Sequence, residues 1–142
     1  MARKSPPKKP LISPDCERKL RLIPGYDPFR DGAGYHFDER LATERVAFFH
    51  ECLHHVKGVK GRPPFLLEDW LQAIVGNLYG WVDADGYRRY REGMLFVPRK
   101  NAKSMLAAGV VLCTLICDDE PGAEIYGAGK DEDQSGRVYE YA

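Results

Sequence analysis

The sequence predicts an α/β fold, a parallel sheet with flanking helices, preceded by a helical N-terminal segment. Residues 94–97 (MLFV) are four apolar residues in a row, which is typical of a strand covered on both faces in a parallel sheet. A charged loop separates this run from residues 103–117, whose Ala, Leu and Val content predicts a buried helix. A second apolar stretch at 123–129 predicts another strand, and residues 130–142 begin a further helix. This order is that of an α/β unit with a right-handed crossover.

The chain has 142 residues, 44% of them hydrophobic, which is enough for one globular domain with a core. Residues 1–14 are basic and proline-rich with little to bury, so we expect a disordered, solvated tail; contact of this tail with nucleic acid is the alternative. We expect residues 15–142 to form the domain. Lys plus Arg equals Asp plus Glu at 21 each, so the average charge indicates neither an acidic nor a basic partner.

The sequence shows no membrane or secretion signal. No apolar run approaches the roughly 18 residues that span a bilayer, and no signal-peptide core follows the N-terminal charges. We therefore expect a soluble, cytoplasmic protein. The four cysteines are too few and too scattered for a disulfide framework, so we expect reduced thiols. Cys113 and Cys117 lie four residues apart in the apolar 103–117 segment, where core packing is favoured over metal binding.

Two amphipathic helices are predicted before the sheet. Residues 11–37 contain several prolines and glycines, which predicts irregular structure. Apolar residues repeat with a 3.6-residue period over 38–56 and again over 67–79, and a loop rich in Gly and Pro separates the two. In the first of these helices His50 and His54 have the i, i+4 spacing of a metal site. No partner carboxylate stands out, so partly exposed helix histidines are favoured.

Residues 81–93 are predicted to form β structure. Asp85-Gly86 is a strong turn signal, and residues 87–91 alternate aromatic and basic side chains, as an exposed edge strand does. The same Tyr and Arg side chains also suit stacking and pairing with nucleic acid, so the sequence leaves both interpretations open.

The sequence VPRKNAKS at 97–104 is the main candidate for a functional site. The phosphate loop of nucleoside triphosphatases has the pattern G-x-x-x-x-G-K-S/T, and alignment on Lys103 and Ser104 places Val97 and Ala102 at its two glycines. The lysine ammonium and the serine hydroxyl of the pattern are kept. They stand at the first turn of a helix whose free N–H groups attract phosphates, an arrangement that suits a polyphosphate with Mg²⁺. A basic turn without a ligand is the alternative.

The residues around this motif resemble the large subunits of tailed-phage terminases. That family carries a variant phosphate loop written like VPRKNGKS. Residues 67–104 resemble the family's adenine-motif helix, its GW turn and the strand that leads to the loop. PGAEIYGAGKDEDQ at 121–134 resembles the second strand and the next helix start. The resemblance covers about residues 36–142, and residues 81–104 are its specific part.

The resemblance implies a P-loop (Walker A) ATPase, a hydrolase that packages bacteriophage DNA into the capsid, with ATP and Mg²⁺ as ligands. Carried over by position, Lys103 and Arg99 are the catalytic residues: Lys103 holds the phosphates and Arg99 responds to the γ-phosphate. Ser104 ligates Mg²⁺. The residues that the resemblance implies in ATP binding are Pro98, Arg99, Lys100, Asn101, Ala102, Lys103, Ser104, Trp70 and Gln72.

The chain departs from the family's pattern at three places. Ala102 replaces the usual glycine. The family's adenine motif has Trp followed at once by Gln, whereas here Leu71 separates Trp70 from Gln72. The Asp-Glu pair that supports hydrolysis, called Walker B, and the nuclease carboxylates are not found. Residues 118–120 (DDE) follow the 103–117 segment too closely for a crossover of a dozen or more residues, so a helix end is predicted there.

We therefore expect a truncated P-loop ATPase domain, the N-terminal portion of a terminase large subunit, whose ability to hydrolyse ATP alone is in question. The implied partners are double-stranded viral DNA, the portal, the small terminase subunit and further copies of the chain in a ring, with no membrane. The implied location is the cytoplasm of a phage-infected or prophage-carrying bacterium. The alternative is a non-catalytic remnant or DNA-binding accessory fragment without ATP turnover. A weaker alternative is an unrelated small phosphate-loop kinase or helicase.

Overall fold

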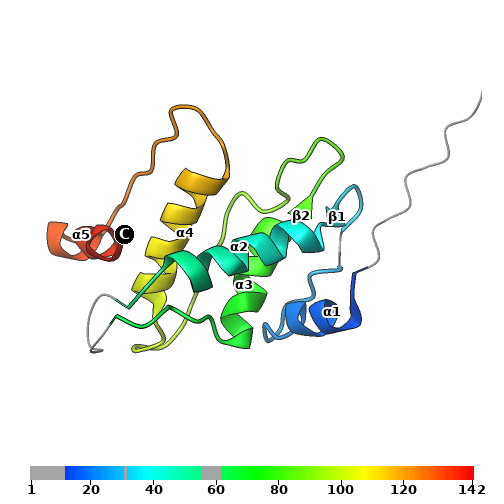
Figure 1. Cartoon of the computed structure of the whole chain (residues 1–142), viewed down its shortest axis with the longest axis horizontal. Coiled ribbons are helices and arrows are strands. Elements are labelled where there is room, and N and C mark those ends of the chain that lie inside the picture. Colours follow the sequence, from blue (N-terminus) through cyan, green and yellow to red (C-terminus); the bar gives the residue numbers. More distant parts are fainter. Residues whose placement is uncertain (1–11, 31, 56–61) are drawn as a thin grey trace, which may run out of the picture. The chain divides into compact units, whose positions relative to one another are not determined.

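A computed structural model describes residues 12–30, 32–55 and 62–142, apart from some side chains of the last helix. The described residues form two compact units: those within 12–46 and 67–93 make the first unit, and those within 47–66 and 94–142 make the second unit. In chain order the described elements are α1 (Pro14–Leu20), β1 (His36–Phe37), α2 (Glu39–Cys52), α3 (Asp69–Gly80), β2 (Trp81–Val82), α4 (Lys103–Cys117) and α5 (Glu132–Tyr141) (Figure 1).

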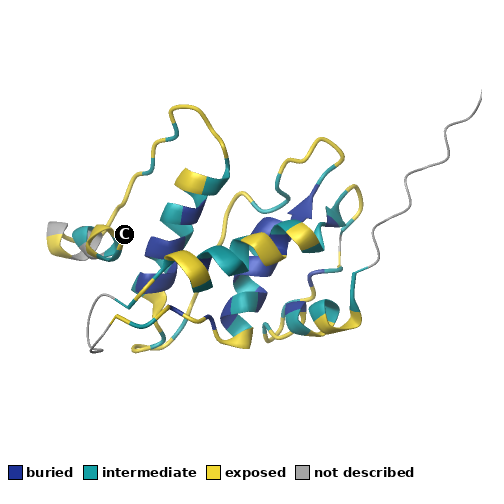
Figure 2. Ribbon diagram, viewed as in Figure 1, coloured by how far each residue is buried: buried dark blue, intermediate teal, exposed yellow. Residues whose placement is uncertain are grey.

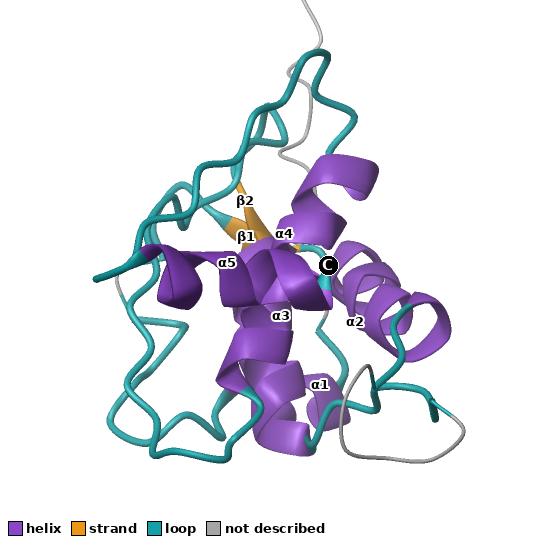
Figure 3. Ribbon diagram, turned by 90° about the vertical axis from the view of Figure 1, so that its left-hand side faces the viewer, coloured by secondary structure: helices purple, strands orange, loops and turns teal. Residues whose placement is uncertain are grey.

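The described residues contain one small sheet, in which β1 and β2 pair antiparallel with His36 opposite Val82 and Phe37 opposite Trp81. Figure 3 shows these strands in orange and the other described residues as helices and loops. The prediction of a parallel sheet, with strands at 94–97 and 123–129, is therefore wrong for the described residues, which form loops at both places.

The physical reason is that an apolar run becomes a buried strand only when neighbouring strands satisfy its backbone and other elements cover both faces. Residues 94–97 pair with no strand of the described chain. Met94 and Phe96 are 82% and 85% exposed. Figure 2 accordingly shows a yellow, exposed loop leading toward α4.

The prediction of irregular structure over 11–37 is wrong where α1 forms. Ser13 caps this helix, because its Oγ accepts a hydrogen bond from the backbone N–H of Cys16 at 3.3 Å, and Pro14 occupies the first turn. Ser13 also donates from its N–H and its hydroxyl to the carboxylate of Glu39 at the start of α2. Residues 1–11, which hold most of the predicted tail, lie outside the described residues.

The other predicted helices are confirmed with small changes at their ends. The helix predicted over 38–56 is α2, which ends at Cys52, so His54 lies beyond it and forms an isolated antiparallel bridge with Pro64 instead. The expected helical face shared by His50 and His54 does not form. Helices α3, α4 and α5 stand where the sequence placed them, and α4 covers the predicted residues 103–117.

The predicted β structure at 81–93 is confirmed in part. Asp83 organises the turn, because its Oδ1 accepts hydrogen bonds from the backbone N–H groups of Asp85 (3.0 Å) and Tyr87 (2.9 Å), and Gly86 has a φ of 87°. Beyond the turn the pairing is limited to an isolated bridge between Val82 and Arg88. None of the helices in the described residues combines the length and the apolar character needed to cross a bilayer.

The core of the first unit surrounds Trp81, whose indole ring meets the rings of Phe29 and Phe37 edge-on at 5.3 and 5.4 Å. Asn77 of α3 is buried beside it. Its Nδ2 donates to the backbone oxygens of Leu20 (3.1 Å) and Ala73 (2.9 Å), and its Oδ1 accepts from Trp81 Nε1 (3.1 Å). One side chain therefore satisfies buried polar groups of α1, α3 and β2.

Asn77→Ala is expected to lower the free energy of unfolding by about 1–2 kcal/mol, because it leaves a buried carbonyl and the indole N–H without their partner. Urea denaturation followed by tryptophan fluorescence measures the change. Asn77→Asp keeps the shape but sets a carboxylate against two carbonyl oxygens, so it should cost at least as much. Unchanged stability in both variants would contradict this role for the amide.

Candidate functional site

The candidate site is the loop at 97–104 in the second unit, which leads directly into α4. Asn101 ties the turn together, because its Nδ2 donates to the backbone oxygen of Pro98 at 3.3 Å. The first hydrogen bond of the helix then runs from the N–H of Leu106 to the backbone oxygen of Ala102 at 2.8 Å. Seven of the predicted ATP-binding residues, those at 98–104, thus form one continuous turn and helix start.

The backbone of this turn is bent by two residues in the left-handed region. Lys100 has a φ of 71°, and Ala102, the N-cap of α4, has a φ of 49° and a ψ of 18°. A left-handed residue followed by right-handed helical residues turns successive N–H groups to the same side, which forms a concave nest for an anion. Position 102 thus has the conformation that favours the glycine of the phosphate-loop pattern.

The start of α4 is chemically open to a negative ligand. No side chain caps its N-terminus by a hydrogen bond, and its first turn carries no acidic residue. The first N–H groups of a helix and its dipole therefore attract an anion here. The side chains of Arg99, Lys100 and Lys103 are exposed around the turn, and Ser104 is half-buried. Three cations without a carboxylate in the loop add to the attraction.

Ala102→Gly is expected to raise the free energy of unfolding by about 0.5–1 kcal/mol. A left-handed residue with a Cβ costs about 1–2 kcal/mol, and the greater freedom of glycine in the unfolded chain offsets part of the gain. Ala107→Gly, in the right-handed interior of α4, is the matched control and should lose about 1 kcal/mol. If chemical denaturation shows that both variants lose the same free energy of unfolding, Ala102 does not have a left-handed conformation.

The two remaining predicted ATP-binding residues, Trp70 and Gln72, belong to the first unit, where both side chains form hydrogen bonds. Trp70 Nε1 donates to a carboxylate oxygen of Glu68 at 2.7 Å. Gln72 Nε2 donates to the backbone oxygen of Leu67 at 2.8 Å, and its Oε1 accepts from Lys19 Nζ at 3.5 Å. Sequence reasoning missed both partners: Glu68 lies two residues from Trp70 and could have been found, whereas nothing local indicates Lys19.

Gln72 also lines a cavity of about 200 Å³ in the first unit, between α1, α2 and α3. Asp15, Lys19 and Glu39 carry the charges of its lining. Cys16 lines it too, and burial, with the nearby carboxylates of Glu39 and Asp15, raises the pKa of this thiol to about 11. The thiol is therefore protonated at neutral pH and is a poor nucleophile.

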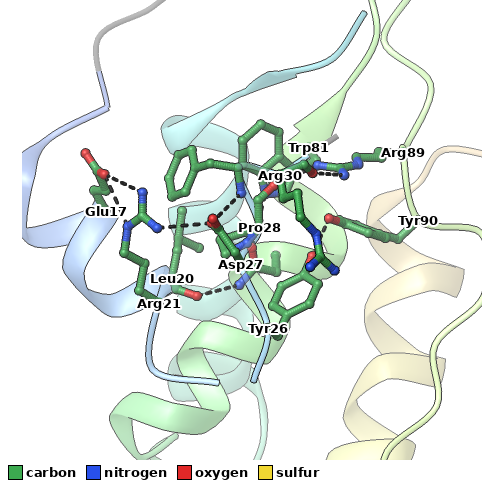
Figure 4. A network of polar contacts seen from close by, with 12 residues as sticks. Glu17, Leu20, Arg21, Tyr26, Asp27, Pro28, Arg30, Trp81, Arg89 and Tyr90 are labelled. Atoms are coloured by element: carbon green, nitrogen blue, oxygen red, sulfur yellow. Dashed lines mark hydrogen bonds and ion pairs between the residues drawn. The ribbon is translucent and has the colours of Figure 1, made fainter. Parts of the chain in front are cut away.

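The Tyr and Arg residues at 87–91, the alternative nucleic-acid interface, are partly used inside the first unit (Figure 4). Arg89 donates to the backbone oxygens of Pro28 and Arg30, both at 2.8 Å, and its guanidinium stacks near the Trp81 ring. Tyr90 accepts a hydrogen bond from the hydroxyl of Tyr26. Arg89 and Tyr90 therefore hold the 26–30 loop, which weighs against a role for them in stacking on bases.

The acidic run at 118–120 forms a helix end, as predicted. Asp118 is the C-cap of α4, and Asp119 has a φ of 51°, which turns the chain away from the helix. Within the described ranges, no group of three or more His, Cys, Asp or Glu side chains is arranged to hold a metal ion. Cys113, predicted to fill the core, is fully buried.

Comparison with known proteins identifies the family of the chain. A family model described as terminase large subunit, ATPase domain, matches residues 69–142, which is more than half of the chain. The chain therefore belongs to the ATPase-domain family of terminase large subunits. The matched region runs from α3 through the loop at 97–104 to α5. No curated protein and no solved structure matches the chain.

Proposed function

We propose that the loop at 97–104 binds the phosphates of ATP together with Mg²⁺, and that the chain is the nucleotide-binding part of a phage DNA-packaging ATPase. Family membership supports an ATPase. The observation that carries the proposal is the left-handed Ala102 directly before an uncapped helix start. This geometry occurs at the position where the phosphate-loop pattern has glycine.

The residues of the loop fit the two ligands. The backbone bend at the left-handed Ala102 would supply N–H groups to the phosphates, and the Lys103 ammonium is the cation for the β- and γ-phosphates. The Ser104 hydroxyl is the group for Mg²⁺, and Arg99 is the second cation near the γ-phosphate. Bound Mg²⁺ neutralises phosphate charge and so makes a triphosphate easier to hold. The loop at 97–104 carries no acidic side chain that would repel the triphosphate.

We also propose that residues 94–97 and 123–129 become parallel strands of a P-loop ATPase sheet once further strands pair with them. The exposure of their large apolar side chains supports this pairing: Met94, Phe96 and Tyr126 are each more than four-fifths exposed. A soluble domain rarely leaves consecutive large apolar side chains in water without a partner for them. Residues 15–142 are then the N-terminal portion of the ATPase domain.

We do not expect this chain to hydrolyse ATP by itself. An Asp-Glu pair that binds the metal and positions water is needed, and the acidic residues at 118–120 form the end of α4 instead. We propose that a polypeptide supplying these carboxylates is required for turnover. The proposed setting is a ring of subunits with double-stranded DNA, the portal and the small terminase subunit, in the cytoplasm of the bacterial host.

Isothermal titration calorimetry of the full chain with ATP tests nucleotide binding. The expected result is one ATP per chain in the presence of Mg²⁺, weaker binding after chelation, and no phosphate release during prolonged incubation. No binding with or without Mg²⁺ would reject the proposal and favour a DNA-binding accessory fragment. Rapid phosphate release would show that the chain carries the hydrolytic residues itself.

A further inference from the structure

We propose that a cavity of the second unit binds a small phosphate monoester with a compact apolar body, separately from the loop at 97–104. The cavity has a volume of about 220 Å³. It is lined by residues 52–55, by Arg62, by one face of α4 and by the end of α5, all of which belong to the second unit. The inference does not rest on the proposed function of the loop.

The polar part of the lining is basic. His54 and Arg62 are exposed and His55 is half-buried, and we call these three residues the basic rim. No side chain that lines the cavity is acidic. Within the part of the chain that the structure describes, the rim side chains form no hydrogen bond or ion pair, and the His55 ring meets the Phe65 ring edge-on at 5.3 Å. Their N–H groups are therefore available to a ligand.

The remainder of the lining is mostly apolar. Met105 and Leu112 are seven residues apart on one face of α4, and Leu53 lies just after α2. Met105 is buried and the other two are half-buried. An apolar surface beside a few polar groups is typical of a small-molecule site. A cavity of about 150 Å³ holds benzene, so this cavity has room for one ring and one phosphate group.

The backbone around the basic rim is fixed before any ligand binds. The N–H of His55 donates to the backbone oxygen of Pro63 at 2.9 Å, and the N–H of Phe65 donates to the backbone oxygen of Leu53 at 2.8 Å. Phe65, whose ring contacts His55, is buried. A ligand therefore does not have to order these two segments, which lowers the entropy lost on binding.

Arg62 has a strained backbone. Its φ is 46°, in the left-handed region, although Arg62 has a Cβ and directly precedes Pro63. Both features make this conformation sterically unfavourable. Strained residues of this kind cluster at ligand sites. The Arg62 guanidinium can pair with a phosphate through two hydrogen bonds, and the two imidazoles supply further donors for its three terminal oxygens.

A metal ion is the other ligand that the histidines suggest. In the described ranges no group of three or more His, Cys, Asp or Glu side chains is arranged to hold one. The permanent positive charge of Arg62 would also repel a cation. An anion is therefore the ligand that the cavity favours.

Amide NMR titration of the full chain with phenyl phosphate tests the inference. Saturable shifts are expected at residues 53–55, 62 and 105–112. Inorganic phosphate, which lacks the ring, should bind about tenfold more weakly. Phenol, which lacks the charge, should not reach saturation. No saturable shift at these residues, or equal affinity for phenol and phenyl phosphate, would overturn the inference.

Arg62→Ala is expected to lower the affinity for phenyl phosphate by about tenfold, because the charge-assisted hydrogen bonds are lost. Arg91→Ala is the matched control: Arg91 is exposed and belongs to the first unit, so its affinity should stay within twofold of the wild type. Equal losses in the two variants would overturn the inference. If Arg62→Ala does not fold, His54→Ala replaces it and is expected to lose affinity while the control does not.

Lys103→Ala separates this cavity from the loop at 97–104. The variant should keep its affinity for phenyl phosphate within twofold and lose affinity for Mg·ATP, whereas Arg62→Ala should show the reverse. Wild-type chain that binds phenyl phosphate and no ATP would reject the proposed function and leave this inference intact. Loss of phenyl phosphate binding in Lys103→Ala would show that the probe occupies the loop, and would overturn the inference.

Discussion

Replacing Lys103 by alanine is expected to lower the affinity for Mg·ATP by about 10- to 100-fold. Lys103 is the first residue of α4 and directly follows the turn in which Lys100 and Ala102 are left-handed. A hydrogen bond to a charged group contributes about 1.5–3 kcal/mol, and each 1.4 kcal/mol is a factor of ten in affinity. Calorimetric titration of the two proteins under the same conditions measures the loss.

Lys130→Ala is the matched control for charge. Lys130 is exposed and lies before α5, outside the loop at 97–104, so its removal changes the net charge equally without touching the proposed phosphate contacts. Its effect on affinity should stay within twofold. If both variants lose the same affinity for Mg·ATP, the effect comes from the net charge of the chain. That result would contradict direct binding of the phosphates by Lys103. The melting temperature of Lys103→Ala should stay close to that of the wild type, because its side chain is exposed.

Gly109→Ala is expected to lower the free energy of unfolding by about 2 kcal/mol. A Cβ at Gly109 in α4 would stand 2.3 Å from Phe49 Cε1 and 2.8 Å from Leu53 Cδ1. Phe49 is 0% exposed, so its ring is enclosed by other groups of the second unit. Overpacking of this kind destabilises a protein by about 1–3 kcal/mol. This exceeds the stabilisation of about 1 kcal/mol that alanine gives over glycine in a helix. Chemical denaturation measures the change.

Gly136→Ala in α5 is the control, because a Cβ at Gly136 meets nothing within 4 Å. That variant should gain up to about 1 kcal/mol from helix propensity alone. The clash can be tested directly by a double-mutant cycle, in which Phe49→Leu removes the ring edge that the new methyl group meets. Gly109→Ala should cost less in the Phe49→Leu background than in the wild type. Equal costs in both backgrounds would contradict the packing described here.

The local features of the fold could be predicted from the sequence. The helix at 103–117 was found because its apolar composition and its end at the acidic run are both local signals. The loop at 97–104 was found because the spacing of its motif is local too. The left-handed conformation of Ala102 occurs where the phosphate-loop pattern has a glycine, the residue that favours a positive φ.

The features that depend on distant partners were missed. Residues 94–97 have the composition of a buried strand but pair with no described strand, because composition predicts burial and cannot supply the neighbour. Lys19 and Gln72 are 53 residues apart, so their contact has no sequence signal. The α1 helix had a readable signal in Ser13-Pro14 followed by an acidic first turn, but the prolines and glycines around it outweighed that signal.

The most direct test of the central claim is an amide NMR titration of the full chain with Mg·ATP. Binding of phosphates by the loop predicts that the largest shifts occur at the N–H groups of residues 99–105, which line the turn and begin α4. The same amides should shift with inorganic tripolyphosphate, which carries the phosphates alone. Saturating Mg·ATP that leaves these amides unmoved, or shifts confined to other parts of the chain, would contradict the claim that this loop holds a triphosphate.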